Sequence, residues 1–223
     1  MNYLLPILAV WLSFIFVFTT KPKNKGAFKL LLAFSGAFLL ALTMFELFPE
    51  VYTGTDSKTV GLFVMLGILL QIFLEFFSKG AEHGHVHLDP ENAQFPWALF
   101  ISLCIHSLLE GLPIENHHNM LYGILVHKIP IAIILSIFLL ASRMKLVPAI
   151  LFIGLFSIMT PLGTLIAAHF SIVETYSIYL NSIVIGVFLH ISTVILFESS
   201  EAHKFNLRKL LVIIIGVAIA YVF

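Results

Sequence analysis

Three residues that can bind a divalent metal ion lie within two neighbouring apolar stretches of the sequence. His106 and Glu110 are four residues apart, so on a helix their side chains project from the same face. His127 lies in the next apolar stretch, and the link over residues 113–118 is short, so the two helices are expected to be antiparallel neighbours. Counted in residues from that link, both histidines lie near the middle of their apolar stretches. Two imidazoles and a carboxylate at one depth predict a site for zinc or a related divalent ion.

Two residues beside His127 affect this site. Pro130 has no N–H to donate to the carbonyl of Val126, which predicts a kink and a free acceptor there. Lys128 places an ammonium next to His127, and it can form an ion pair with Glu110 that offsets the cost of burying both charges. A buried ion pair without any metal is the alternative interpretation of these two charges. For His190, in a later apolar stretch, a structural hydrogen bond between helices is the alternative to a metal-binding role.

The elements that carry these residues are membrane helices. Hydrophobic residues make up 60% of the chain and charged residues 11%, whereas soluble domains have roughly 25% charged residues. The outer surface of a chain this apolar must contact lipid. The formal net charge of zero gives no indication of nucleic-acid binding. Cys104 is the single cysteine, which excludes a disulfide framework and a cysteine zinc cluster.

The predicted fold is all-α, a single polytopic bundle of eight transmembrane helices over residues 1–223. A spanning helix needs about 20 mostly apolar residues, and eight stretches meet this requirement. They cover approximately residues 2–20, 28–49, 59–77, 95–113, 119–141, 146–169, 176–198 and 207–223, with a histidine-containing loop over 78–94. Eight crossings place ten Lys and Arg residues on one side, Lys58 on the other and Lys128 inside a span. This asymmetry predicts that both termini are extracytoplasmic.

Five short motifs resemble, in order and in position, those of the ZIP family of divalent-metal transporters. The segment 106–111 (HSLLEG) is similar to the fourth-helix pattern H-N-x-x-E-G of that family, and 127–130 (HKIP) to its fifth-helix pattern H-x-x-P. The other similar fragments are 46–50 (ELFPE), 157–163 (SIMTPLG) and 186–189 (GVFL). The resemblance covers nearly the whole chain, and eight spans with both termini outside is the layout of this family.

The resemblance implies a transporter, not an enzyme, that moves a divalent metal ion toward the cytoplasm. Zinc is the ion that it favours. The resemblance also implies a multi-pass protein of the plasma (inner) membrane with spans 2, 4, 5 and 7 as its core; a homodimer is left open. The family builds a two-metal centre, but Ser107, Lys128 and Ile131 stand here at positions that usually supply further ligands. We therefore expect one ion, held by His106, Glu110 and His127, with Ser107 and Lys128 as second-site or gating residues.

Further residues are expected on either side of the centre. At the outer mouth, acidic and histidine side chains can concentrate cations; they are Glu46, Glu50, His117 and His118. On the inner side, histidines at alternate positions of the 78–94 loop form a metal-binding tract. The expected exit residues are His83, His85, His87, His190 and Glu198.

Two other functions are compatible with the same residues. An intramembrane zinc-dependent hydrolase also uses buried histidines, an acid and a metal-bound water. A metal-sensing homologue that does not transport is the other alternative, because Lys128 and Ile131 replace usual ligands. The residues do not select among divalent ions, since imidazole and carboxylate ligands suit several of them.

Overall fold

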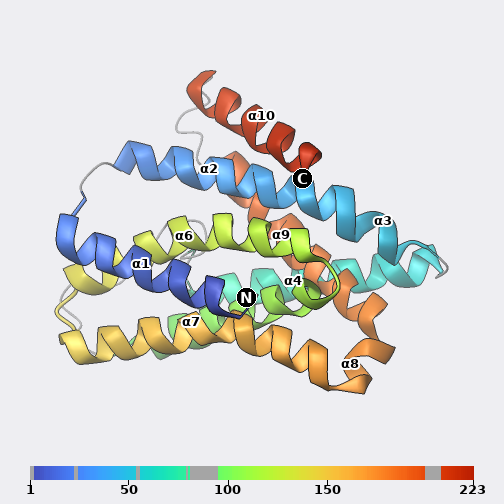
Figure 1. The fold of residues 1–223 in the computed structure, drawn as a ribbon, viewed down its shortest axis with the longest axis horizontal. Coiled ribbons are helices and arrows are strands. Elements are labelled where there is room, and N and C mark those ends of the chain that lie inside the picture. The colour runs from blue at the N-terminus through green and yellow to red at the C-terminus, as the bar shows by residue number, and fades with distance from the viewer. Residues whose placement is uncertain (1–2, 23–24, 54–55, 79, 81–94, 199–206) are drawn as a thin grey trace.

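Every element in the described part of the chain is helical, which confirms the all-α prediction (Figure 1). The computed structural model describes residues 3–22, 25–53, 56–78, 80, 95–198 and 207–223. The first half contains α1 (Leu4–Thr20), α2 (Lys25–Leu42), the π-helical segment η1 (Thr43–Leu47), α3 (Phe48–Val51), α4 (Ser57–Ser78), α5 (Trp97–Gly111) and the 3-10 segment η3 (Leu112–Glu115). The second half contains α6 (His118–Ala141), α7 (Leu146–His169), α8 (Ser171–Thr175), α9 (Ser177–Glu198) and α10 (Leu207–Val222).

Six helical segments of the described chain are long and apolar enough to cross a membrane. They are Gly26–Val51, Ser57–Ser78, Trp97–Glu115, His118–Ala141, Leu146–His169 and Ser177–Phe197. α1, with 17 residues, and α10, with 16, are apolar but shorter. A helix therefore lies in each predicted stretch, while eight crossings and the side of the two termini stay predictions.

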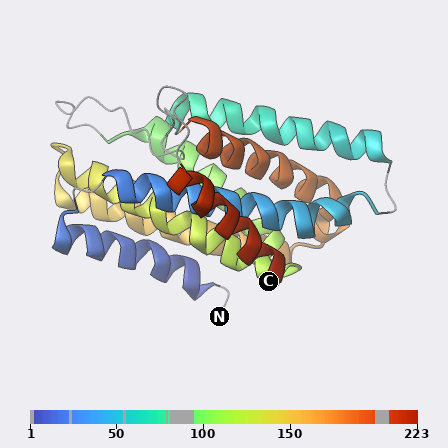
Figure 2. The same cartoon turned by 90° about the horizontal axis from the view of Figure 1, so that it is seen from above.

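α6, which carries His127, lies between α1 and α2 (Figure 2). α2 packs against α6, α9 and α10, and α5 packs against α7 and α4. α1 flanks α6 and α7 on one side, and α10 runs along α2 on the other (Figure 1). α4 packs most extensively against α9.

Paired glycines bring α4 and α9 into direct backbone contact. A methyl group added at Gly67 would lie 2.0 Å from the carbonyl oxygen of Ile183, and one at Gly186 would lie 2.1 Å from that of Val64. No side chain fits at these distances. Small residues allow such close approach of membrane helices, where lipid supplies no hydrophobic drive for association.

The same arrangement joins α5 to α7. A methyl group at Gly111 would lie 2.1 Å from the carbonyl oxygen of Thr160, and one at Gly163 would lie 2.1 Å from that of Leu108. Next to this contact, the hydroxyl of Thr164 donates to the carbonyl of Gly111 at 3.0 Å. Because α5 carries His106 and Glu110, this contact sets the height of two candidate ligands relative to α7.

The C-terminal part of the second apolar stretch departs from α-helical geometry around Glu46. Residues Thr43–Leu47 form a π-helical turn, and α3 then begins at Phe48. Pro49 has no N–H, and in a regular α-helix its ring would clash with the carbonyl of Phe45, so the wider turn accommodates the proline. By contrast, α6 continues as one helix through Pro130; the predicted kink there stays a prediction.

The glycine contact between α4 and α9 predicts the effect of a single methyl group. Gly67→Ala should destabilise the protein by about 1–3 kcal/mol, because the new methyl group must push two backbones apart. Thermal unfolding of the purified protein in detergent measures this change. Gly61→Ala is the control on the same helix, since its methyl group would lie 3.9 Å from Tyr52 and a helical alanine should add up to about 1 kcal/mol of stability. Equal stabilities of the two variants would contradict the packing described here.

Candidate metal centre

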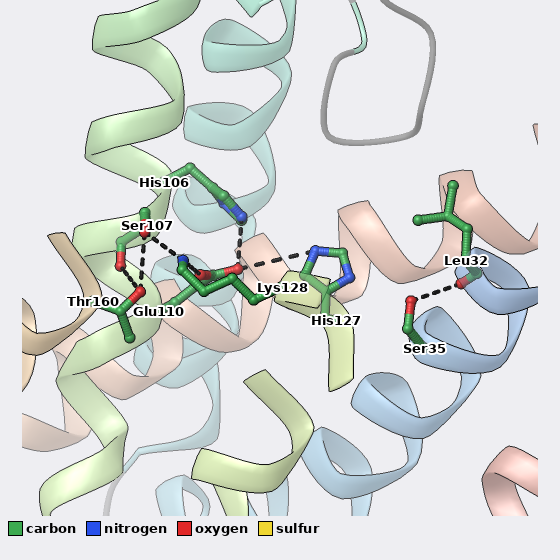
Figure 3. A network of polar contacts seen from close by, with 8 residues as sticks. All are labelled: Leu32, Ser35, His106, Ser107, Glu110, His127, Lys128 and Thr160. Carbon is green, nitrogen blue, oxygen red and sulfur yellow. Dashed lines mark hydrogen bonds and ion pairs between the residues drawn. The ribbon is translucent and has the colours of Figure 1, made fainter. Parts of the chain in front are cut away.

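The structure brings His106, Glu110 and His127 together in the interior (Figure 3). One ligand atom from each residue lies within 4.8 Å of the other two. The Nε2 atom of His106 is 2.8 Å from Oε1 of Glu110, and Nε2 of His127 is 4.0 Å from the same oxygen. All three side chains are buried, with 1–3% of each residue exposed. α5 supplies His106 and Glu110 one turn apart, and α6 supplies His127.

These three donors fit a divalent metal ion in type and in spacing. Zinc prefers imidazole nitrogen and carboxylate oxygen at roughly 2.0–2.2 Å in a tetrahedral arrangement, which separates neighbouring ligand atoms by about 3.3 Å. The His106–Glu110 separation is shorter than this value, and the His127–Glu110 separation is longer. Both separations are within about 1 Å of the value for zinc, and three protein ligands would leave one position for water.

The second oxygen of Glu110 is held by Lys128, as the sequence predicted. The ammonium of Lys128 donates to Glu110 Oε2 at 3.0 Å and to the hydroxyl of Ser107 at 2.6 Å. It also lies over the ring of Phe156, 4.5 Å from the centroid. A buried ammonium has three donor hydrogens and no water to receive them. A carboxylate, a hydroxyl and an aromatic face together compensate this charge.

Thr160 of α7 extends this network and was not predicted as a site residue. Its hydroxyl donates to the carbonyl oxygen of Ser107 at 3.0 Å, and the two hydroxyls are also 3.0 Å apart. Because the carbonyl can only accept, the proton of Thr160 is used there, and the Ser107 hydroxyl donates to Thr160. Thr160 lies within the fragment 157–163, which resembled a family motif. That resemblance was the one signal for Thr160; nothing in the sequence indicated Phe156.

The predicted outer residues lie near the start of α6. His117, just before α6, has its Nε2 atom 2.7 Å from Oε2 of Glu50, and Glu50 is half exposed. Glu46 accepts a hydrogen bond from the side chain of Asn119 at 2.8 Å. His118 is exposed at the first residue of α6. The structure therefore joins Glu50 to His117 and pairs Glu46 with Asn119, a residue that was not predicted for the site.

On the α4 side, His190 meets a carboxylate that sequence reasoning missed. Its Nε2 atom is 2.7 Å from Oε2 of Glu75, and both side chains are partly exposed. Glu75 is an ionisable residue inside a predicted span, a class that is functional by default in membranes, and this signal could have identified it. The side chain of Glu198, the last residue of α9, and the predicted residues His83, His85 and His87 lie outside the described residues.

Comparison with known proteins identifies the family. Residues 91–223, more than half of the chain, match the family described as ZIP Zinc transporter. The zinc transporter ZIP1 of Danio rerio is 31% identical over an alignment of 157 positions, which covers 63% of this chain and 51% of that relative. The chain thus spans about half the length of the curated relative that it matches. With its apolar helices and its motifs in this order, the chain is a polytopic helical membrane protein and belongs to the ZIP family.

Proposed function

We propose that this chain transports a divalent metal ion, with zinc as the favoured ion, through a site formed by His106, Glu110 and His127. The observation that carries the proposal is the buried cluster itself, since three donors of the types that zinc prefers converge from two helices of membrane-spanning length. Family membership supports the same function, because the Danio rerio relative is a zinc transporter.

The centre holds one ion. Lys128 occupies the space beside Glu110 Oε2 and Ser107, where a second cation would need the same oxygens. Ile131, one turn after His127, is buried and offers hydrocarbon. An ammonium this close also repels an arriving cation, so it weakens binding and favours release. Conduction requires a site that the ion can leave.

The proposed route runs from the extracytoplasmic side to the cytoplasm across the plasma membrane. Cations are first attracted at the outer mouth by Glu46, Glu50, His117 and His118. They lose most of their water at the centre and then reach the Glu75–His190 pair, with Glu198 and the histidines of the 78–94 loop beyond it. Both termini are extracytoplasmic in this orientation, which follows from the positive-inside rule.

An intramembrane hydrolase with the same cluster would keep its zinc ion bound, whereas a transporter releases it. A hydrolase retains its zinc and needs a base to activate water. In this structure both oxygens of Glu110 are engaged, one by His106 and the other by Lys128. Transport is therefore the better-supported function. A homologue that only senses metal would bind the ion without moving it.

Flux into proteoliposomes tests the proposal. Wild-type protein should carry Zn²⁺ into vesicles, and His127→Ala should lower the rate at least about tenfold, because even the loss of a residue that only orients a metal ligand commonly costs 10–100-fold. His169→Ala is the control, since His169 is an exposed histidine at the end of α7. Normal transport by His127→Ala would show that the site is wrong, and absence of flux in the wild type with tightly retained zinc would favour the hydrolase or the sensor.

A change at Lys128 tests the number of ions. Lys128→Asp should bind two zinc ions per chain where the wild type binds one, because it replaces an ammonium by a ligand beside Glu110. Equilibrium zinc titration with elemental analysis measures the stoichiometry.

Lys128→Met is the matched variant that removes the charge without adding a ligand. It should still bind one ion, and in metal-free protein it should be destabilised by roughly 3–5 kcal/mol because Glu110 loses its counter-charge. If Lys128→Asp still bound a single ion, the ammonium of Lys128 would not be what limits the centre to one ion.

A further inference from the structure

Gln71 is a fully buried polar residue in the second half of α4, and no described residue forms a hydrogen bond with its side chain. None of its surface is exposed, and neither its amide nitrogen nor its carbonyl oxygen has a partner within the part of the chain that the structure describes. A buried carboxamide without partners costs free energy, and native proteins satisfy nearly all such groups. Its presence in an apolar helix therefore calls for a partner that is not a fixed part of the fold.

The position of Gln71 along α4 is defined by two contacts with α9. Gly67, four residues before it, touches the backbone of Ile183. Glu75, four residues after it, meets His190. Residues four apart lie on one face of a helix, about 6 Å apart along the axis. Gln71 therefore lies on the α4 face toward α9, between the closest backbone contact and the Glu75–His190 pair.

The same helix also borders the candidate metal centre. α4 packs against α5, which carries His106 and Glu110. In Figure 3 the α4 ribbon passes behind α5 near His106. α4 thus packs beside the helix that carries His106 and Glu110, and it also carries Glu75 of the Glu75–His190 pair. Gln71 is fully buried and lies one turn before Glu75 on this helix.

A carboxamide is suited to brief contact with a cation. Its oxygen is a ligand for divalent metal ions, but it carries no formal charge. It needs no buried counter-ion and holds a metal more weakly than a carboxylate does. A chain of sites conducts only when each binds weakly enough to release the ion to the next one.

We propose that Gln71 is a transfer ligand, whose carbonyl oxygen binds the metal ion as it passes from the His106–Glu110–His127 centre to the Glu75–His190 pair. This inference rests on the proposed transport function and adds to it an intermediate binding position. A cation, or water that accompanies it, supplies the partner that the described residues do not.

Gln71→Met separates this role from that of an ordinary core residue. Methionine has nearly the same length but no polar group, so removing an unsatisfied carboxamide should leave the protein as stable as the wild type or more stable. Zinc affinity at the centre should change less than about twofold, because no centre ligand is altered, while Zn²⁺ flux into proteoliposomes should fall about tenfold.

Ser192→Ala is the matched control. Ser192 is also fully buried, and its hydroxyl has no hydrogen-bond partner among the described residues. It lies two residues from His190, and residues two apart do not share a helix face. The control should keep wild-type flux. If Gln71→Met also kept it, the proposal would be overturned.

Gln71→Glu provides a second, independent measurement by zinc titration of the detergent-purified protein. It places another carboxylate one turn from Glu75, so it should bind one more zinc ion per chain than the wild type at the same free Zn²⁺ concentration. An unchanged stoichiometry would overturn the role of Gln71 as a ligand, even if Gln71→Met failed to fold. Absence of flux in the wild type would instead contradict the proposed function, and the titration would still decide whether Gln71 can bind the ion.

Discussion

The carboxylate of Glu110 is the group around which the interior is organised. One oxygen faces the imidazoles of His106 and His127, and the other accepts from Lys128. A carboxylate within a lipid-surrounded bundle is costly unless it is compensated, and an ammonium at 3.0 Å compensates it. The ion pair thus leaves one carboxylate oxygen directed at the histidines, so charge compensation and ligand presentation are achieved by the two sides of one side chain.

The backbone contact between α5 and α7 holds this carboxylate in place. Gly111 follows Glu110 directly and touches the backbone of Thr160, whose hydroxyl in turn bonds to the carbonyl of Ser107. Ser107 then accepts from Lys128. The network therefore reaches the ammonium of α6 from α7 through α5. A shift of one helix would change the contact distances of the ammonium and of the carboxylate together.

The polar groups of the bundle are distributed unevenly between its helices. The centre is formed by α5 and α6, whereas the Glu75–His190 pair belongs to α4 and α9. These two sets of helices meet where α4 packs against α5. A cation that passes between them must leave ligands of one set for ligands of the other, and the carboxamide of Gln71 lies on the helix where the sets meet.

The sequence by itself determined the helices and the central trio. Apolar length set the helices, so that α7 has the bounds predicted for span 6, and the four-residue spacing of His106 and Glu110 with a short link placed His127 opposite them. Only the tertiary structure decided the partners across helices that are distant in the chain: Glu75 with His190, Ser107 with Thr160, and Phe156 under Lys128. In lipid a helix can be apolar on every side, so its sequence does not show which face meets which neighbour. Rotation and height are set by packing, here by glycines that allow backbone contact at a few positions.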